Sequence, residues 1–319
     1  MKLNEITIEV TQQCPNCCIY CSSLSDMTKT EQLDYVTIIK VIDDAALLGA
    51  KSVSLSGGEP FLRKDIVEIV NHIYNKGLKV LVYSSGIYSG EGGRLAIPKP
   101  ILSSLQSKLD ALIFNYESIQ PELYSAIMGN KPSDIKLLDE TITSAIGLNI
   151  PVEVHLVPMR CNFKQIPEVL DKVYAMGVKK VSFLRLVPQG RALSNHEMVL
   201  LGKEEQEELK QILKNCQATY KDKIRIGLPF AASRSDCGTG TNKLTIRYDG
   251  YVFPCEAFKE GLMEINEGIT PDNVKAKSLR QIYEESPYLM SIRICLESHK
   301  GCENSEYCYG QHCRKVNKK

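Results

Sequence analysis

The sequence lacks a strong net charge, a long apolar run and a signal peptide. Its 319 residues carry a formal net charge of +1 and no long basic or acidic block. Charge therefore gives no indication of binding to nucleic acid or to an anionic membrane surface. Every apolar run is shorter than the roughly 18 residues that a membrane-spanning helix needs. The first segment, MKLNEITIEVTQQC, interrupts its apolar residues with polar ones, unlike a secretory signal. We therefore expect a cytoplasmic protein with no membrane partner.

Cysteine, in contrast, is abundant in an otherwise ordinary composition. Apolar residues make up 43% of the chain and charged residues 24%, which is typical of a globular protein with a hydrophobic core. The 12 cysteines occupy positions 14, 17, 18, 21, 161, 216, 237, 255, 295, 302, 308 and 313. In a reducing compartment, clustered cysteines more often bind metal or carry out redox chemistry than form disulfides. Their distribution predicts two metal-binding regions separated by a scaffold.

The scaffold alternates strand-like and helix-like segments. The expected strands are 5–11, 52–57, 79–86, 111–117, 152–158 and 178–188. The expected helices are 37–50, 66–77, 98–108, 135–149, 166–177 and 203–220. This alternation predicts an α/β fold with parallel strands, right-handed crossovers and ligands at the carboxyl ends of the strands. Six units are fewer than the eight of a closed barrel, so an open partial barrel and a doubly wound sheet both fit.

The pattern of alternating strand-like and helix-like segments ends near residue 222. The segments KIRIGLP and KLTIRYDGYVFPC have strand character, and the second contains a turn signal at Asp249–Gly250. The chain beyond them is irregular and rich in cysteine. We therefore predict two domains, 1–221 and 222–319. A Gly/Ser-rich insert, SGEGGR (89–94), follows the third expected strand.

The first cysteine cluster follows the first expected strand. Cys14, Cys18 and Cys21 are spaced C-x3-C-x2-C, and Pro15 favours a turn over a continuous helix. A cubane iron–sulfur cluster normally takes four protein ligands, so three thiolates would leave one iron open. An open coordination position is typical of catalytic rather than structural metal sites. The alternative is a structural zinc site in which Cys17 is the fourth ligand.

The stretch CPNCCIYC resembles the CxxxCxxC signature of radical S-adenosylmethionine (radical SAM) enzymes. The resemblance implies that Cys14, Cys18 and Cys21 hold a [4Fe-4S] cluster whose open iron chelates S-adenosylmethionine. One electron from the cluster then cleaves the sulfonium, and the resulting 5′-deoxyadenosyl radical abstracts a hydrogen atom. It also implies a partial (βα)6 TIM-like barrel and a reductant such as flavodoxin or ferredoxin. Tyr20 stands where the family usually carries an aromatic residue.

A second motif, SLSGGEP, ends the next expected strand. Glycine there lets the backbone approach a ligand closely. The motif resembles the GGEP segment of radical SAM enzymes, which binds the methionine amino group of the cofactor. The resemblance assigns this role to Gly57, Gly58, Glu59 and Pro60. Taken alone, the motif would also fit an ordinary turn between a strand and a helix.

Further cofactor contacts are predicted at the ends of later strands. The resemblance implies contacts from Ser84 and Ser85, and from Arg191 in LRLVPQGRA, which could pair with a carboxylate. Turn serines and a surface arginine are the alternatives. Glu153 and His155 alternate with apolar residues and are expected to share the inner face of the barrel. They could contact cofactor or substrate, or form a buried hydrogen-bonded pair.

The second cysteine cluster resembles the SPASM and Twitch extensions of radical SAM enzymes. The matching pieces are Gly250-x4-Cys255 in DGYVFPC and the C-x5-C-x4-C tail CENSEYCYGQHC. The resemblance implies one or two auxiliary [4Fe-4S] clusters. The first would use Cys237, Cys255 and Cys313, with or without one more cysteine, and the second Cys295, Cys302 and Cys308 with His299 or an outside ligand. His299 stands where the family has a cysteine, and a structural zinc module is the alternative.

Cys161 follows VPMR, just beyond a strand end, where active-site residues collect. It is the candidate for a thiol that returns a hydrogen atom, as in radical epimerases, although a buried packing role would also fit. Cys17 and Cys216 have no expected cluster role.

The expected substrate is a ribosomally made peptide that undergoes cross-linking, epimerisation or oxidation. This expectation comes from the resemblance, because relatives with C-terminal cluster domains modify such peptides or act on small molecules such as aminoglycosides. A small-molecule dehydrogenase or epimerase is the first alternative. Only 13 residues precede Cys14, so we expect no leader-binding domain ahead of it. A non-catalytic iron–sulfur or zinc protein would explain the cysteines but not the GGEP segment.

Overall fold

The computed structural model describes residues 2–221, 223–227, 238–259 and 269–298. Most of its strands form one sheet in the order β11-β10-β1-β2-β3-β6-β7-β8-β9. The strands are β1 (Glu5–Thr11), β2 (Ser52–Gly57), β3 (Lys79–Ser84), β6 (Ala111–Asn115), β7 (Val152–Leu156), β8 (Lys180–Phe183), β9 (Arg225–Gly227), β10 (Lys243–Ile246) and β11 (Val252–Phe253). From β1 to β8, all neighbours in the sheet pair in parallel.

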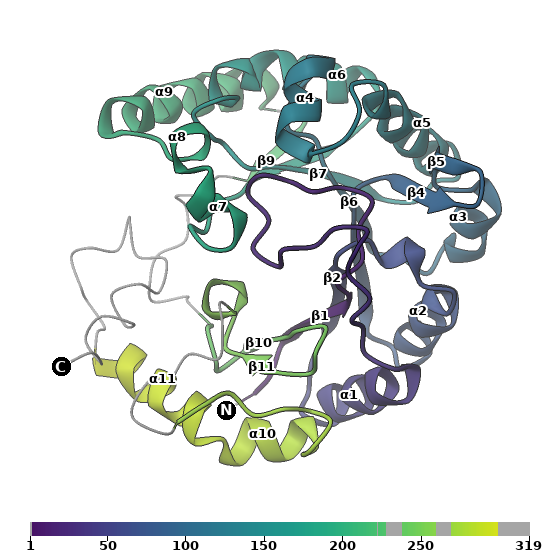
Figure 1. Cartoon of the computed structure of the whole chain (residues 1–319), viewed down its shortest axis with the longest axis vertical. Coiled ribbons are helices and arrows are strands. Elements are labelled where there is room, and N and C mark those ends of the chain that lie inside the picture. Colours follow the sequence, from purple (N-terminus) through teal and green to yellow (C-terminus); the bar gives the residue numbers. More distant parts are fainter. Residues whose placement is uncertain (1, 222, 228–237, 260–268, 299–319) are drawn as a thin grey trace.

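Helices cover the outer side of the curved sheet (Figure 1). They are α1 (Tyr35–Leu47), α2 (Ile66–Asn75), α3 (Lys99–Leu105), α5 (Asp134–Gly147), α6 (Ile166–Ala175) and α9 (Lys203–Tyr220). Within the described residues the two end strands, β9 and β11, do not pair with each other. The sheet is therefore open, and the prediction of a partial (βα)6 barrel is confirmed.

Alternation along β1 shows how the sequence specifies the two faces of the sheet. Ile6, Ile8 and Val10 are fully buried in the hydrophobic core. Glu9 and Thr11 point to the opposite, inner face, because successive side chains of a strand alternate between faces. The outer face of the sheet therefore carries the apolar side chains of the core. The inner, concave face carries polar side chains that can take part in chemistry.

The loops hold more structure than the sequence predicted. The Gly/Ser-rich insert forms an antiparallel hairpin of β4 (Ile87–Gly90) and β5 (Gly93–Ala96). The strand expected over 178–188 ends at Phe183 instead. The chain then turns at Gly190, whose positive φ of 58° suits glycine, and enters the short helices α7 (Arg191–Ser194) and α8 (His196–Val199). A further helix, α4 (Pro121–Met128), follows β6.

Residues beyond 222 extend both edges of the sheet. β9 pairs in parallel with β8, and β10 pairs in parallel with β1. β10 and β11 form an antiparallel pair joined through the predicted Asp249–Gly250 turn. Helices α10 (Leu279–Glu285) and α11 (Pro287–Ser298) follow. The two-domain division at 222 stays a prediction. Across the described ranges, no helix has both the length and the apolar character to cross a membrane.

Candidate active site

The cysteine loop lies over the inner side of the sheet, among the carboxyl ends of the strands (Figure 1). Helix α4 supports one side of it, because the Cys17 and Ile19 amides donate to the carbonyls of Met128 and Ile127 at 3.0 and 2.9 Å. A Cβ atom on Gly129 would lie 2.4 Å from the Cys17 carbonyl oxygen. Glycine at the end of α4 is therefore what allows the loop to approach this closely.

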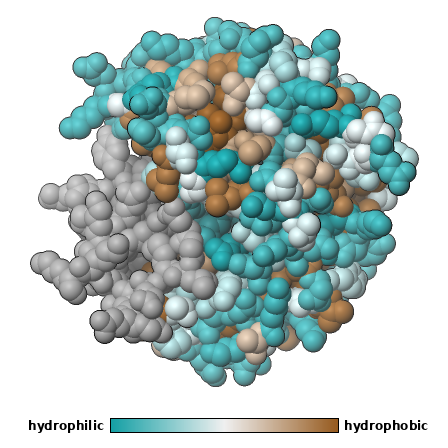
Figure 2. Space-filling view, viewed as in Figure 1, coloured by the Kyte–Doolittle hydropathy of each residue, from teal (hydrophilic) through white to brown (hydrophobic). Residues whose placement is uncertain are grey.

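Arg191, at the start of α7, supports the other side of the loop. Its Nε donates to the Cys18 carbonyl at 2.8 Å, its Nη2 to the Ser25 carbonyl at 2.7 Å and its amide to the Cys21 carbonyl at 3.1 Å. Arg191 thus binds the main chain of the cysteine loop. Its predicted pairing with a cofactor carboxylate stays a prediction. Two large apolar side chains of these segments, Leu24 and Leu193, are exposed. Figure 2 shows hydrophobic residues near the middle of the viewed face of the molecule.

The three predicted ligands are close enough to influence one another. Burial raises the pKa of Cys14, as do the charges of Glu59 and Cys21. Burial also raises the pKa of Cys18, and Cys14 and Cys21 add to the effect. The amide of Asn16 donates to the Cys14 sulfur at 3.5 Å.

Such thiols suit a cationic group that would stabilise them as thiolates. Among the described residues, no three potential ligands converge on a point that a single metal ion could occupy. Three thiols on one loop are the donor set that leaves one iron of a cubane open, and Cys17, the fourth ligand of the alternative zinc site, is exposed. The residues therefore fit a [4Fe-4S] cluster, although the ligand assignment itself stays a prediction.

The two glycines of the GGEP segment bring the end of β2 against the chain that enters the cysteine loop. The Gly58 amide donates to the Thr11 carbonyl at 2.7 Å, and the Glu59 amide to the Gln13 carbonyl at 2.8 Å. A Cβ atom would lie 2.4 Å from the Thr11 oxygen at Gly57 and 2.0 Å from the Gln13 oxygen at Gly58. In this structure, the glycines therefore allow a close approach to the backbone of β1 and of the residues that follow it.

Glu59 is completely buried beside this junction. Its carboxylate accepts hydrogen bonds from the Ser84 hydroxyl at 2.9 Å, from the Ser85 amide and hydroxyl at 2.7 and 2.5 Å, and from the Phe61 amide at 3.2 Å. Burial raises the pKa of Glu59 to about 6, against the lowering effect of these donors. Within the described residues, no lysine or arginine forms an ion pair with Glu59. The predicted site residues Ser84 and Ser85 both hold this carboxylate.

Glu117 is a second buried carboxylate that the sequence analysis did not single out. It accepts hydrogen bonds from the Tyr20 hydroxyl at 2.8 Å, the Asn115 amide nitrogen at 3.2 Å and the Val157 main-chain amide at 3.0 Å, and Asn162 lies near its other oxygen. Burial raises the pKa of Glu117 to about 7. Its position at the end of an expected strand was the available signal. Tyr20 thus reaches a carboxylate of the protein.

Glu153 also lies on the inner face, and one of its partners is a lysine. It bonds to His155 Nε2 at 2.9 Å, to Lys180 Nζ at 2.6 Å and to the Ser182 hydroxyl at 2.7 Å. Burial alone would raise the pKa of Glu153, but these three bonds outweigh it and lower the pKa to about 2. The ring of Tyr83 packs edge-on against His155, with ring centroids 5.4 Å apart. This arrangement favours the buried-pair interpretation, and a cofactor contact by Glu153 stays a prediction.

Cys161 is partly buried, and its amide donates to the Met198 carbonyl of α8 at 3.1 Å. Burial, with a contribution from Glu117, raises the pKa of Cys161 to about 11. It is therefore a protonated thiol at neutral pH, the form that a hydrogen-atom donor requires. Cys216 is buried in α9, in agreement with a packing role.

The second cysteine region is described in part. Cys255 is buried at the start of a short 3-10 helix, Glu256–Phe258. Four residues later, the buried Lys259 ammonium forms an ion pair with Glu9 and donates to the Ser23 hydroxyl at 2.8 Å, so this segment touches the first cysteine loop. Cys295 belongs to α11, but its side chain lies outside the described part, as do Cys237, His299, Cys302, Cys308 and Cys313.

Comparison with known families identifies the class of protein. Residues 8–173 match the radical SAM superfamily, and residues 237–314 match SPASM, described as an iron–sulfur cluster-binding domain. The first match covers more than half of the chain, which therefore belongs to the radical SAM superfamily. The protein is a radical SAM enzyme, and its cofactors are S-adenosylmethionine and [4Fe-4S] clusters.

Curated relatives and solved structures are similar over most of the chain. The PqqA peptide cyclase of Methylobacterium sp. (strain 4-46) is 28% identical over 323 residues, which cover 95% of this chain and 79% of the relative. The PqqA peptide cyclase of Gluconobacter oxydans (strain 621H) is 28% identical over 312 residues, or 95% and 83%.

Two solved structures support the fold. Streptococcus suis SuiB bound to S-adenosylmethionine superposes with a TM-score of 0.75 at 16% identity, over 97% of this chain and 72% of SuiB. The enzyme anSMEcpe with bound AdoMet gives a TM-score of 0.68 at 11% identity, over 96% and 88%.

Proposed function

We propose that Cys14, Cys18 and Cys21 hold the [4Fe-4S] cluster whose open iron binds S-adenosylmethionine. The observation that carries this proposal is that three thiols lie on one loop, which α4 and Arg191 hold in place beside Glu59. That carboxylate is buried and has only neutral hydrogen-bond partners. The amino group of S-adenosylmethionine, polarised by the iron, would donate a hydrogen bond to Glu59, and a hydrogen bond to the charged form favours the ionised carboxylate.

In this proposal, the other predicted cofactor residues mainly support Glu59 and the cysteine loop. Ser84 and Ser85 orient Glu59 through three hydrogen bonds. Gly57 and Gly58 allow the segment that carries Glu59 to pack against the chain leading to Cys14. Pro60 begins the short 3-10 helix Pro60–Leu62 that follows.

We propose that the cysteines beyond 222 hold one or two auxiliary [4Fe-4S] clusters. The SPASM match over 237–314 and the burial of Cys255 support this assignment. An auxiliary cluster can accept the electron that remains after hydrogen abstraction. A small electron carrier such as flavodoxin or ferredoxin would supply the electron that starts the reaction.

We infer that the substrate is a ribosomally made peptide. Relatives named PqqA peptide cyclase match 95% of the chain, and one structure with the same fold is described as SuiB bound to its precursor peptide SuiA. The reaction would abstract a hydrogen atom from the peptide and then form a cross-link, epimerise a centre or oxidise it. For epimerisation, Cys161 is the proposed donor because it follows the carboxyl end of β7, where active-site residues collect.

The cluster assignment is tested with anaerobically reconstituted protein, dithionite and S-adenosylmethionine. The wild type should form 5′-deoxyadenosine, and Cys18→Ala should form none because the cluster loses one of its three thiolates. Cys216→Ala is the matched control, since this buried thiol of α9 has no expected cluster role. Cofactor cleavage by Cys18→Ala at the wild-type rate would refute the assignment.

The substrate class is tested separately with peptides encoded in the neighbourhood of the gene. We expect one of them to change mass in a reaction that requires S-adenosylmethionine and reductant. If such peptides stay unmodified while a small molecule such as an aminoglycoside is oxidised or epimerised, the peptide proposal is wrong and the cluster assignment is unaffected.

A further inference from the structure

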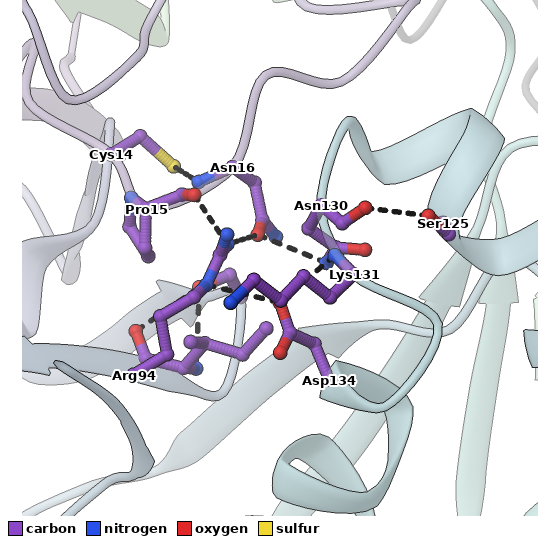
Figure 3. A network of polar contacts seen from close by, with 10 residues as sticks. Cys14, Pro15, Asn16, Arg94, Ser125, Asn130, Lys131 and Asp134 are labelled. Atoms are coloured by element: carbon purple, nitrogen blue, oxygen red, sulfur yellow. Dashed lines mark hydrogen bonds and ion pairs between the residues drawn. The ribbon is translucent and has the colours of Figure 1, made fainter.

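The hairpin β4–β5 places an arginine against the cysteine loop. Arg94 is 79 residues away from Pro15 in the sequence, yet its Nη2 donates to the Pro15 carbonyl oxygen and to Asn16 Oδ1, the latter at 2.8 Å (Figure 3). Both acceptors lie between Cys14 and Cys18. The hairpin is the insert for which the sequence predicted neither structure nor role.

The contact belongs to a network of buried polar groups. Arg94 Nε pairs with Asp134 Oδ2 at 3.0 Å, and Asn130 Nδ2 donates to Asn16 Oδ1 at 3.1 Å. Asp134 and Asn16 are only 3% and 1% exposed. Arginine has donors and no acceptor, so the Asn16 oxygen must face Arg94, and the orientation of this side chain is determined.

The network ends at a predicted cluster ligand. The main-chain amide of Asn16, whose side chain Arg94 and Asn130 hold, donates to the Cys14 sulfur at 3.5 Å. Hydrogen bonds to the sulfurs and the local charge both set the reduction potential of an iron–sulfur cluster. Groups outside the ligand set that orient the ligands typically change metal affinity when they are removed.

We propose that Arg94 is a positioning residue for the cluster that binds S-adenosylmethionine. It holds Asn16 so that the amide stays directed at the Cys14 sulfur. A hydrogen bond to this sulfur raises the reduction potential of the cluster and makes its first reduction easier. This inference rests on the proposed ligand set of Cys14, Cys18 and Cys21.

The experiment compares Arg94→Ala and Arg94→Lys with the wild type in the full-length, anaerobically reconstituted enzyme. The signal to follow is the electron paramagnetic resonance of the reduced cluster that changes when S-adenosylmethionine is added, because auxiliary clusters do not bind the cofactor. The midpoint potential of that signal is measured together with the rate of iron loss to a chelator. Arg280→Ala is the matched control, since Arg280 forms an exposed pair with Glu284 on α10.

For Arg94→Ala we expect a lower midpoint potential and roughly 10-fold faster iron loss from this cluster, which corresponds to the lower end of outer-shell effects on metal affinity. Arg94→Lys should lie between Arg94→Ala and the wild type, because lysine keeps hydrogen-bond donors but not their fork. Arg280→Ala should match the wild type. An unchanged potential and unchanged iron loss in Arg94→Ala would overturn the proposal, and Arg94→Lys replaces it in the test if that variant does not fold.

Asp134→Asn separates the role of Arg94 at the loop from general support of the hairpin. It removes the buried acid that pairs with Arg94 but leaves the arginine donors that reach Pro15 and Asn16. The midpoint potential should therefore not fall. A fall equal to that of Arg94→Ala would contradict the proposal. A Cys14→Ala variant that keeps the S-adenosylmethionine-responsive signal would instead refute the proposed ligand set itself.

Discussion

Two sets of buried carboxylates in this protein have opposite electrostatic surroundings. At the carboxyl ends of the strands, Glu59 and Glu117 accept hydrogen bonds from hydroxyl and amide groups, and burial raises their pKa values to about 6 and 7. On the inner face of the sheet, Glu153 is bonded to Lys180 and its pKa falls to about 2, and Glu9 is paired with a buried lysine.

The difference separates groups that stabilise the fold from groups available to a ligand. A carboxylate already paired with a cation gains little from a second one. A buried carboxylate with neutral partners is costly to ionise, and a cationic ligand removes this cost. The strand ends, where the cysteine loop lies, are therefore the part of the inner side that we propose for a positively charged cofactor.

Replacing Glu59 by glutamine should give the largest effect on cofactor binding. The variant keeps the shape of the side chain but loses the negative charge that we propose accepts a hydrogen bond from the cofactor amino group. Removing a hydrogen bond to a charged group costs about 1.5–3 kcal/mol, or roughly 10- to 150-fold weaker binding of S-adenosylmethionine. Equilibrium dialysis with the reconstituted protein measures this. Glu153→Gln is the control and should bind normally, and equal binding by both variants would contradict the comparison.

Replacing Glu153 by glutamine should reduce stability. Breaking a buried ion pair from one side typically costs 3–5 kcal/mol, and since the Lys180 side chain is 42% exposed we expect a smaller loss, about 2 kcal/mol. Urea unfolding of the apoprotein checks it. Glu59→Gln should show no such loss. If Glu59→Gln proves the less stable variant, the assignment of structural and ligand-binding carboxylates is reversed.

The two carboxylates should also give opposite pH dependence in the apoprotein. The pKa of Glu59 rises from 4.5 to about 6 on folding. Its contribution to the free energy of unfolding is therefore fully present below pH 4.5 and is lost as the pH rises through 6. That loss is about 2 kcal/mol. The pKa of Glu153 falls from 4.5 to about 2, so its contribution is present above pH 4.5 and is lost as the pH falls to 2.

Urea unfolding of the variants at several pH values should resolve these windows. Glu59→Gln should lose the component between pH 4.5 and 6, and Glu153→Gln the component below pH 4.5. If either variant shows the same dependence of unfolding free energy on pH as the wild type, the carboxylate that it lacks does not titrate as described.

The smallest expected effect is that of Tyr20→Phe. The substitution removes one of the neutral donors to Glu117 and costs about 1 kcal/mol of unfolding free energy. S-adenosylmethionine cleavage should continue, because Tyr20 reaches a carboxylate of the protein. Loss of cleavage with unchanged stability would instead assign Tyr20 a direct role at the cofactor.

Local patterns predicted much of this structure. The six parallel strands were recognised as strand-like segments that alternate with helix-like ones, and the cysteine loop and the GGEP segment from a few neighbouring residues each. The partners of these residues could not be predicted in the same way. Arg94 reaches Asn16, and Lys259 reaches Glu9, across 78 and 250 positions of sequence. Such contacts depend on how distant elements pack, which no short pattern contains.

The sequence by itself determined the βα order, the spacing of the three thiols and the glycines that a close backbone approach requires, because these depend on residues near one another in the chain. Only the tertiary structure decided which buried carboxylates have cationic partners and which have neutral ones. A strand fixes the face on which a side chain lies, but the groups that meet it there come from other strands and loops.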